Sequence, residues 1–176
     1  METTKNILPE NISIFFKELS DYLDTKLLFY GSVQRNDYFP GNSDIDVDIF
    51  TDNENSIIIK LQHFLHVKHN KFKKIVWRLS DSKKIIYGHK IMYKNTDMNL
   101  AVEFSIYNER NKQDVLKHHL KKIVLPFYAS WFLMIIKKLF YDFHIINFET
   151  YKFLKSKMLS FGIGYPEEQF IVLDKK

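Results

Sequence analysis

The segment from Ser43 to Phe50 carries a strict alternation of acidic and apolar side chains. Successive side chains of an extended strand point to opposite faces, so this strand has one acidic face and one apolar face. The acidic face holds Asp44, Asp46 and Asp48, and the apolar face holds Ile45, Val47 and Ile49. The apolar face requires a hydrophobic core. The acidic face requires a cation or water, because an unpaired buried carboxylate is costly.

The first two aspartates are the best candidates for metal ligands. Neighbouring residues on one face of a strand lie roughly 6.5 to 7 Å apart, so the carboxylates of Asp44 and Asp46 can converge on one hard cation such as Mg²⁺. Asp48 is twice as far from Asp44 and is a secondary candidate. The pattern therefore predicts a divalent-cation site at the start of this strand.

An apolar run, Leu27 to Tyr30, precedes the acidic strand and ends at the pair Gly31-Ser32. Glycine lets the backbone approach a ligand closely, and backbone amides with the serine hydroxyl can grip phosphate oxygens. The alternative is an ordinary tight turn, and the aspartates that follow favour phosphate binding. Arg35 either steadies the next loop or contacts phosphate.

These residues together resemble a known signature. Gly31-Ser32, eleven intervening residues and then Asp44-Ile45-Asp46 resemble the motif of the nucleotidyltransferase superfamily, which includes DNA polymerase β, poly(A) polymerases and minimal nucleotidyltransferases. The resemblance covers Leu27 to Phe50 and continues more loosely to Asn108. It implies a glycine-serine turn that holds a nucleoside triphosphate, aspartates that bind two divalent ions (Mg²⁺ or Mn²⁺), and a third carboxylate on a later strand.

Glu103 matches the position of that third carboxylate, where the family commonly has aspartate. It is the charged residue of a predicted strand from Leu100 to Tyr107, with Ala101 and Ser105 on the same face. The alternative interpretation is a surface charge on an edge strand. Asp97, which lies in a predicted turn, is the second candidate for the third carboxylate.

The resemblance thus implies catalytic and metal-binding roles for Asp44, Asp46 and Glu103. It implies nucleotide contacts for Gly31, Ser32, Arg35 and Ser43. The alternative for Ser43 is that it is simply the residue at which the chain enters the strand.

The composition fits one packed domain with an anionic partner. A chain of 176 residues with 45% hydrophobic and 16% aromatic residues can bury a real core and is not disordered. The net charge of +5 favours a nucleotide or nucleic acid as partner. Lysine supplies 23 of the 26 basic residues, however, and this bias also arises in A/T-rich genomes.

Other classes of site are disfavoured. The chain has no cysteine, which excludes disulfides and thiolate metal sites. His63, His66 and His69 lack acidic partners nearby, which argues against zinc. The first ten residues do not resemble a signal peptide, so we expect an intracellular, cytoplasmic protein.

The expected fold is α/β (α+β), with a mixed β-sheet core backed by helices over 1–108 and a helical part packed on it over 109–176. The apolar spacing predicts helices over 9–24, 109–123, 127–144 and 148–160, and strands over 27–30, 44–50, 75–79, 84–93 and 100–107. A further helix is expected after a polar cap at Thr51–Glu54, with Ile58, Leu61 and Leu65 on its apolar face, and it includes His63 and His66. The segment Phe170 to Leu173 either adds an edge strand or docks on the helices.

Two further surfaces are candidates for partners. The basic segments Lys68–Lys74 and Lys117–Lys122 are either solvated or contact a polyanion. The helix over 127–144 is apolar nearly all round, which predicts burial or cover by a second copy or a partner protein. Its uninterrupted apolar run is too short to cross a membrane.

The predicted activity is metal-dependent transfer of a nucleoside monophosphate from a nucleoside triphosphate to an acceptor hydroxyl, with release of pyrophosphate. The acceptor stays open between a small molecule, a protein hydroxyl and an RNA end. The alternative is a catalytically weak module of the same fold that binds nucleic acid or a partner protein.

Overall fold

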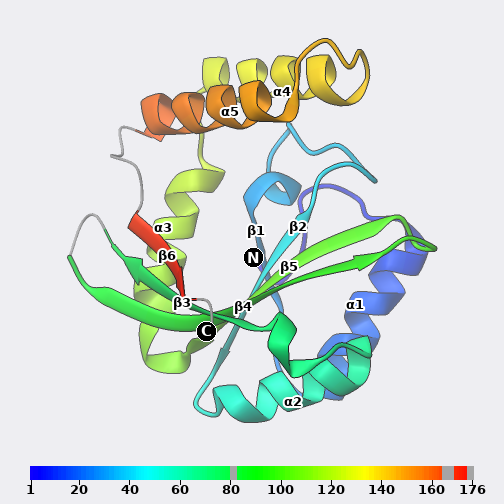
Figure 1. Cartoon of the computed structure of the whole chain (residues 1–176), viewed down its shortest axis with the longest axis vertical. Coiled ribbons are helices and arrows are strands. Elements are labelled where there is room, and N and C mark those ends of the chain that lie inside the picture. Colours follow the sequence, from blue (N-terminus) through cyan, green and yellow to red (C-terminus); the bar gives the residue numbers. More distant parts are fainter. Residues whose placement is uncertain (80–82, 164–168, 174–176) are drawn as a thin grey trace.

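A mixed six-stranded sheet forms the centre of the computed structural model, which describes residues 1–79, 83–163 and 169–173 (Figure 1). The strand order is β1-β2-β5-β4-β3-β6; β2 and β5 are parallel, and the other neighbours are antiparallel. The strands are β1 Leu28–Tyr30, β2 Ile45–Thr51, β3 Lys73–Arg78, β4 Ile85–Asn95, β5 Leu100–Asn108 and β6 Gln169–Leu173. The helices are α1 Glu10–Leu23, α2 Glu54–Leu65, α3 Lys112–Ile123, α4 Phe127–Tyr141 and α5 Phe148–Ile163, with short 3-10 turns η1 Gly31–Gln34, η2 His69–Lys71 and η3 Glu109–Asn111. The predicted fold class is confirmed.

Helices α1 and α2 cover one face of the sheet. The buried residues of α1 recur at helical spacing and meet the apolar face of β2 and β5 in one core. The Asn53 side chain accepts a hydrogen bond from the Ser56 amide and caps the start of α2. Val47, Phe104 and Ile106 are fully buried here, so the register of β2 and β5 is set by this core.

The other face of the sheet is covered over only part of its length. Helix α3 packs through Val115 on a cluster that includes Trp77 and Tyr107. Helices α4 and α5 lie side by side above this face and have a small core of their own around Leu133 and Tyr151 (Figure 1, top). A pocket lies between α5 and the uncovered part of the sheet.

Several element boundaries differ from the expectations. The helix predicted from 127 ends at Tyr141, and the helix predicted from 109 begins at Lys112 because η3 precedes it. Residues 169–173 form an edge strand on β3, so the first alternative for this segment is confirmed. Helix α4 has a buried face and an exposed face rather than a fully covered surface, with Phe127 84% exposed and Trp131 57% exposed. In the described part of the chain, no helix is long and apolar enough to span a bilayer.

Candidate active site

A pocket of about 270 Å³ brings together the Gly31-Ser32 turn and the aspartates Asp44 and Asp46. Six of the predicted site residues line it: Gly31, Ser32, Arg35, Asp44, Asp46 and Glu103. Other lining residues come from elements far apart in sequence, and these include Tyr30, Lys90, His119, Lys155 and Leu159. The pocket therefore combines carboxylates, cations and aromatic rings.

Strand pairing explains why two of the carboxylates meet. Asp46 on β2 is the direct partner of Glu103 on the parallel strand β5, so both side chains stand on the same face. Tyr30 on β1 is the partner of Asp46 on the other side. Asp44 immediately precedes β2 and shares the face of Asp46 because it lies two residues earlier.

Gly31 allows the turn η1 to approach Asp46 closely. Its φ of 70° is in the left-handed region that favours glycine, and it begins η1 directly after β1. A Cβ atom at this position would overlap the Asp46 carboxylate. Glycine is thus required here both by the backbone conformation and by the contact.

We expect Gly31→Ala to destabilise the protein by about 1 to 3 kcal/mol and to abolish any activity that depends on Asp46, because the new methyl group displaces that carboxylate. Gly41→Ala is the matched control, since Gly41 has a similar φ of 77° but its Cβ would meet the Asn99 amide. Urea unfolding and activity should separate the two variants. Equal activities would contradict a special role for the Gly31–Asp46 contact.

The electrostatic environment of Asp46 reflects the crowding of negative charge. Burial, together with the nearby negative charges of Asp44 and Glu103, raises the pKa of Asp46 to about 7, although the cations Lys155 and Lys90 oppose this shift. The Glu103 carboxylate in turn receives the Lys90 ammonium at 2.6 Å. The site therefore favours an added positive charge next to Asp46.

The residues present fit a hard divalent cation only in part. Within residues 1–79, 83–163 and 169–173, no group of three or more histidine, aspartate or glutamate side chains is arranged to hold a metal ion. Asp44 and Asp46 offer the oxygen ligands that Mg²⁺ and Mn²⁺ prefer, and both line the pocket. The Glu103 carboxylate is instead paired with the Lys90 ammonium, so an ion at Glu103 would compete with that contact.

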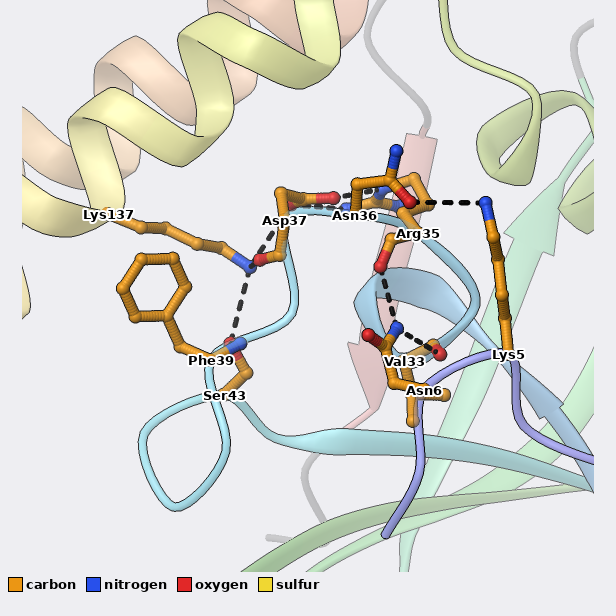
Figure 2. A network of polar contacts seen from close by, with 9 residues as sticks. All are labelled: Lys5, Asn6, Val33, Arg35, Asn36, Asp37, Phe39, Ser43 and Lys137. Atoms are coloured by element: carbon orange, nitrogen blue, oxygen red, sulfur yellow. Dashed lines mark hydrogen bonds and ion pairs between the residues drawn. The ribbon is translucent and has the colours of Figure 1, made fainter.

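The loop between the two motifs is held by a buried polar network (Figure 2). Arg35 donates to the Asp37 carboxylate at 2.7 and 3.1 Å. Lys137 of α4 reaches the same residue, with its ammonium 2.6 Å from the Asp37 carbonyl oxygen and 3.1 Å from its carboxylate. Burial alone would raise the pKa of Asp37, but Arg35 and Lys137 outweigh burial and lower it. Burial lowers the pKa of Lys137 to about 8, although Asp37 opposes that shift.

The structure places Ser43 in this network beside the pocket. Its hydroxyl accepts hydrogen bonds from the Phe39 amide at 3.2 Å and from Lys137 at 3.3 Å. On the other side of the loop, the Asn6 side chain donates to the carbonyl oxygens of Val33 and Arg35 (Figure 2). The segment that carries Arg35 is therefore fixed from both the N-terminal segment and α4.

The two secondary carboxylates lie elsewhere. Asp48 is fully buried, and its carboxylate lies 3.5 Å from the His119 imidazole. Asp97 is exposed in the turn between β4 and β5. Asp48 thus continues the row of aspartates on β2 into the protein interior. Asp97 lies in a turn and does not line the pocket.

Two cations of the pocket were missed in the sequence. Lys155 comes from α5, and no local pattern distinguishes it from Lys152 or Lys157. Lys90 stands on the same face of β4 as Met92, which pairs with Glu103, so strand alternation could have identified it once the pairing of β4 and β5 was known.

Comparison with known proteins finds one family model and several similar solved structures. The model of the nucleotidyltransferase domain family matches residues 10–145. Two similar solved structures are of the Cid1 poly(U) polymerase: one with MgGTP bound (15% identity, TM-score 0.41, 72% of this chain and 39% of that chain) and one in complex with the UTP analog UMPNPP (13% identity, TM-score 0.38, 74% of this chain and 41% of that chain). This chain therefore spans about two fifths of the length of those polymerase chains. No curated protein matches the sequence. Since the family model covers most of its length, the chain belongs to the nucleotidyltransferase domain family.

Proposed function

We propose that this protein is a metal-dependent nucleotidyltransferase that transfers a nucleoside monophosphate from a nucleoside triphosphate to an acceptor hydroxyl. The observation that carries the proposal is a single pocket lined by the Gly31-Ser32 turn and by Asp44, Asp46 and Glu103. Membership of the nucleotidyltransferase domain family supports the same reaction class.

The triphosphate would lie on the η1 side of the pocket. The Ser32 hydroxyl and the backbone amides of the turn would donate hydrogen bonds to phosphate oxygens, and Arg35 and Lys155, which also line the pocket, would add positive charge. Arg35 is already oriented by Asp37, which limits the conformational freedom it loses on binding. These groups would orient the α-phosphorus toward Asp46 and Glu103.

Asp44, Asp46 and Glu103 would hold two divalent ions, Mg²⁺ or Mn²⁺. When bound, these ions supply positive charge to the attacking and leaving oxygens of an in-line displacement. Lys90 would release Glu103 as that site fills, because both compete for the same carboxylate.

In the transfer step, the acceptor hydroxyl oxygen forms a bond to the α-phosphorus, and the bond from that phosphorus to the bridging oxygen of pyrophosphate breaks. Pyrophosphate leaves with the electron pair of that bond. The hydroxyl proton passes to the Glu103 carboxylate. Positioning and charge neutralisation by the chain carry most of such catalysis.

The test is transfer from each of the four nucleoside triphosphates labelled at the α-phosphate, with Mg²⁺ or Mn²⁺, a single-stranded RNA and the protein itself as acceptors. We expect labelled product and pyrophosphate from the wild-type protein, and loss of both on chelation of the metal or in Asp44→Asn. Equal background from the wild type and Asp44→Asn would refute the proposal.

A second candidate is a catalytically weak module that binds nucleic acid or a partner protein. The observation that favours it is the Lys90–Glu103 pair, which occupies the third carboxylate. The exposed aromatic side chains of α4 would then meet a second copy or a partner, and the transfer experiment distinguishes this candidate because it predicts no pyrophosphate release.

A further inference from the structure

A short segment before α1, Thr3–Asn6, runs beside the turn η1 and is joined to it by hydrogen bonds (Figure 2). We call this segment the strap. The Gln34 side chain of η1 donates to the Thr3 carbonyl oxygen at 2.7 Å and accepts from the Lys5 amide at 3.0 Å. The same side chain donates to the Phe29 carbonyl oxygen of β1 at 3.1 Å. The strap is thus tied to the end of η1 and, through Gln34, to β1.

Asn6 connects the strap to the backbone of the turn. Its carboxamide donates to the Val33 carbonyl oxygen at 2.8 Å and to the Arg35 carbonyl oxygen at 2.7 Å (Figure 2). Its backbone amide also donates to the Val33 carbonyl oxygen, at 3.3 Å. Carbonyl groups at the end of a helical turn lack a partner within that turn, so a donor from outside has to satisfy them. One side chain therefore satisfies two carbonyl groups of the segment that carries Arg35.

The direction of these carbonyl groups decides what the turn presents to the pocket. Ser32 and Arg35 line the pocket, whereas Asn6 does not. The C=O and N–H bonds of one planar peptide unit point in opposite directions, so carbonyl oxygens that face Asn6 turn the amides of Gln34 and Asn36 away from it. A carbonyl oxygen that rotated into the pocket would repel a phosphate, because both carry negative charge.

Arg35 is the residue through which the contact of Asn6 reaches the pocket. Its carbonyl oxygen accepts from Asn6, and its amide donates to the Ser32 carbonyl oxygen at 2.8 Å and closes η1. Its guanidinium donates to the Asp37 carboxylate. A shift of the Arg35 backbone would therefore move both the guanidinium and the turn that carries Ser32.

We infer that Asn6 is a positioning residue for the triphosphate, because it holds Ser32 and Arg35 in the arrangement that receives the phosphate oxygens. This inference rests on the proposed function. A turn that is held before the ligand arrives loses less conformational freedom on binding, which raises the affinity. The strap precedes residue 10, where the match to the nucleotidyltransferase domain family begins, so this contact belongs to a part of the chain outside the matched range.

The test measures the binding of inorganic tripolyphosphate to the whole chain by isothermal titration calorimetry in the presence of Mg²⁺. This probe has neither a base nor an acceptor, so its binding depends neither on the choice of nucleotide nor on transfer. Asn6→Ala removes both hydrogen bonds that the side chain donates. Asn6→Asp keeps the size of the side chain, but an ionised aspartate has only acceptors and faces two carbonyl oxygens.

Asn95→Ala is the matched control. The Asn95 side chain accepts from the Met98 amide at 3.0 Å and donates to the Tyr93 hydroxyl at 3.3 Å, so this variant also loses two hydrogen bonds of a half-buried asparagine. Asn95 belongs to β4 and does not line the pocket. Urea unfolding of all three variants verifies that each titration contains folded protein.

We expect the affinity for tripolyphosphate to fall by about five- to tenfold in Asn6→Ala, to fall further in Asn6→Asp, and to stay within about twofold of the wild-type value in Asn95→Ala. The affinity for Mn²⁺ alone, followed by electron paramagnetic resonance, should not change in Asn6→Ala, because the Asn6 side chain contacts the turn and not the aspartates. A role in the general stability of the pocket would lower both affinities together.

Four results would overturn the inference: no tripolyphosphate binding by the wild type, unchanged binding in both Asn6 variants, an equal loss in Asn95→Ala, or a parallel loss of Mn²⁺ affinity in Asn6→Ala. Failure of the proposed function alone would look different. Tripolyphosphate binding would then still depend on Asn6, but no nucleotide would be transferred.

Discussion

Asp46→Asn should lower nucleotidyl transfer by at least about a thousandfold and at the same time stabilise the metal-free protein at pH 8. The loss of transfer follows because asparagine cannot supply the negative charge that Asp46 gives to the site. The gain in stability follows because Asp46 is partly buried next to Asp44 and Glu103, which repel its negative charge. One substitution should therefore change activity and stability in opposite directions.

The pH dependence distinguishes this gain from a general effect. The pKa of Asp46 is about 7 in the folded protein, whereas the ordinary value of an aspartate, 3.8, applies to the unfolded chain. Between pH 3.8 and about pH 7, the folded state therefore binds more protons than the unfolded state. The contribution of Asp46 to wild-type stability therefore falls as pH rises from about 4 to 7. At about 1.4 kcal/mol per pKa unit, Asp46→Asn is more stable than the wild type by up to about 4 kcal/mol at pH 8 and by little at pH 4.

Urea unfolding at pH 4.5 and pH 8 in the presence of a chelator measures this difference. Asp97→Asn removes the same charge from an exposed turn and should change neither stability nor transfer. Added Mn²⁺ should narrow the gap at pH 8, because it neutralises the wild-type carboxylates. A gap of the same size at both pH values would show that repulsion at Asp46 is not its cause.

Lys137→Met should destabilise the protein by about 3 to 5 kcal/mol, the usual cost of removing one partner of a buried ion pair. The Lys137 side chain is 2% exposed and the Asp37 side chain is 0% exposed, so water cannot replace the lost ammonium. The same change releases the Asp37 carbonyl oxygen and the Ser43 hydroxyl. Because this loop leads into Asp44, we also expect weaker transfer at temperatures where the variant is still folded.

Lys138→Met is the control for that experiment. Lys138 is the next residue of α4, is exposed, and loses the same charge. Its free energy of unfolding should stay within about 0.5 kcal/mol of the wild-type value. If both variants lose a comparable amount of unfolding free energy, helix α4 tolerates replacement of neither lysine, and the contact of Lys137 with Asp37 is not the cause.

The acidic strand β2 and the strand β5 could be predicted from the sequence, because the alternation of polar and apolar side chains is visible within a few residues. The period of two assigns Asp44 and Asp46 to one face whatever surrounds them, and the same rule assigns Glu103 to the polar face of its strand. The left-handed turn at Gly31 is likewise a local property. The fold class and the residues around the motif could therefore be predicted.

The contacts that tune the site could not be predicted, since they join distant parts of the chain. Lys137 reaches Asp37 across a separation of 100 residues, and nothing around either residue signals the pairing. In the sequence, Lys137 even resembles a solvated residue that interrupts an apolar helix. Lys90 depends on the pairing of β4 with β5, and Ser43 depends on the position of α4.

The parallel pairing of β2 with β5 also has a consequence for how the molecule is made. It joins Asp46 to Glu103 from positions 46 and 103, with α2, β3 and β4 in the intervening crossover. Parallel strands that are this far apart in sequence pair slowly, because the crossover loses its chain entropy before the contacts between the strands have formed. During synthesis on the ribosome we therefore expect Asp46 and Glu103 to stay apart in water, so that their mutual repulsion arises only once the apolar layer beneath β2 and β5 has formed.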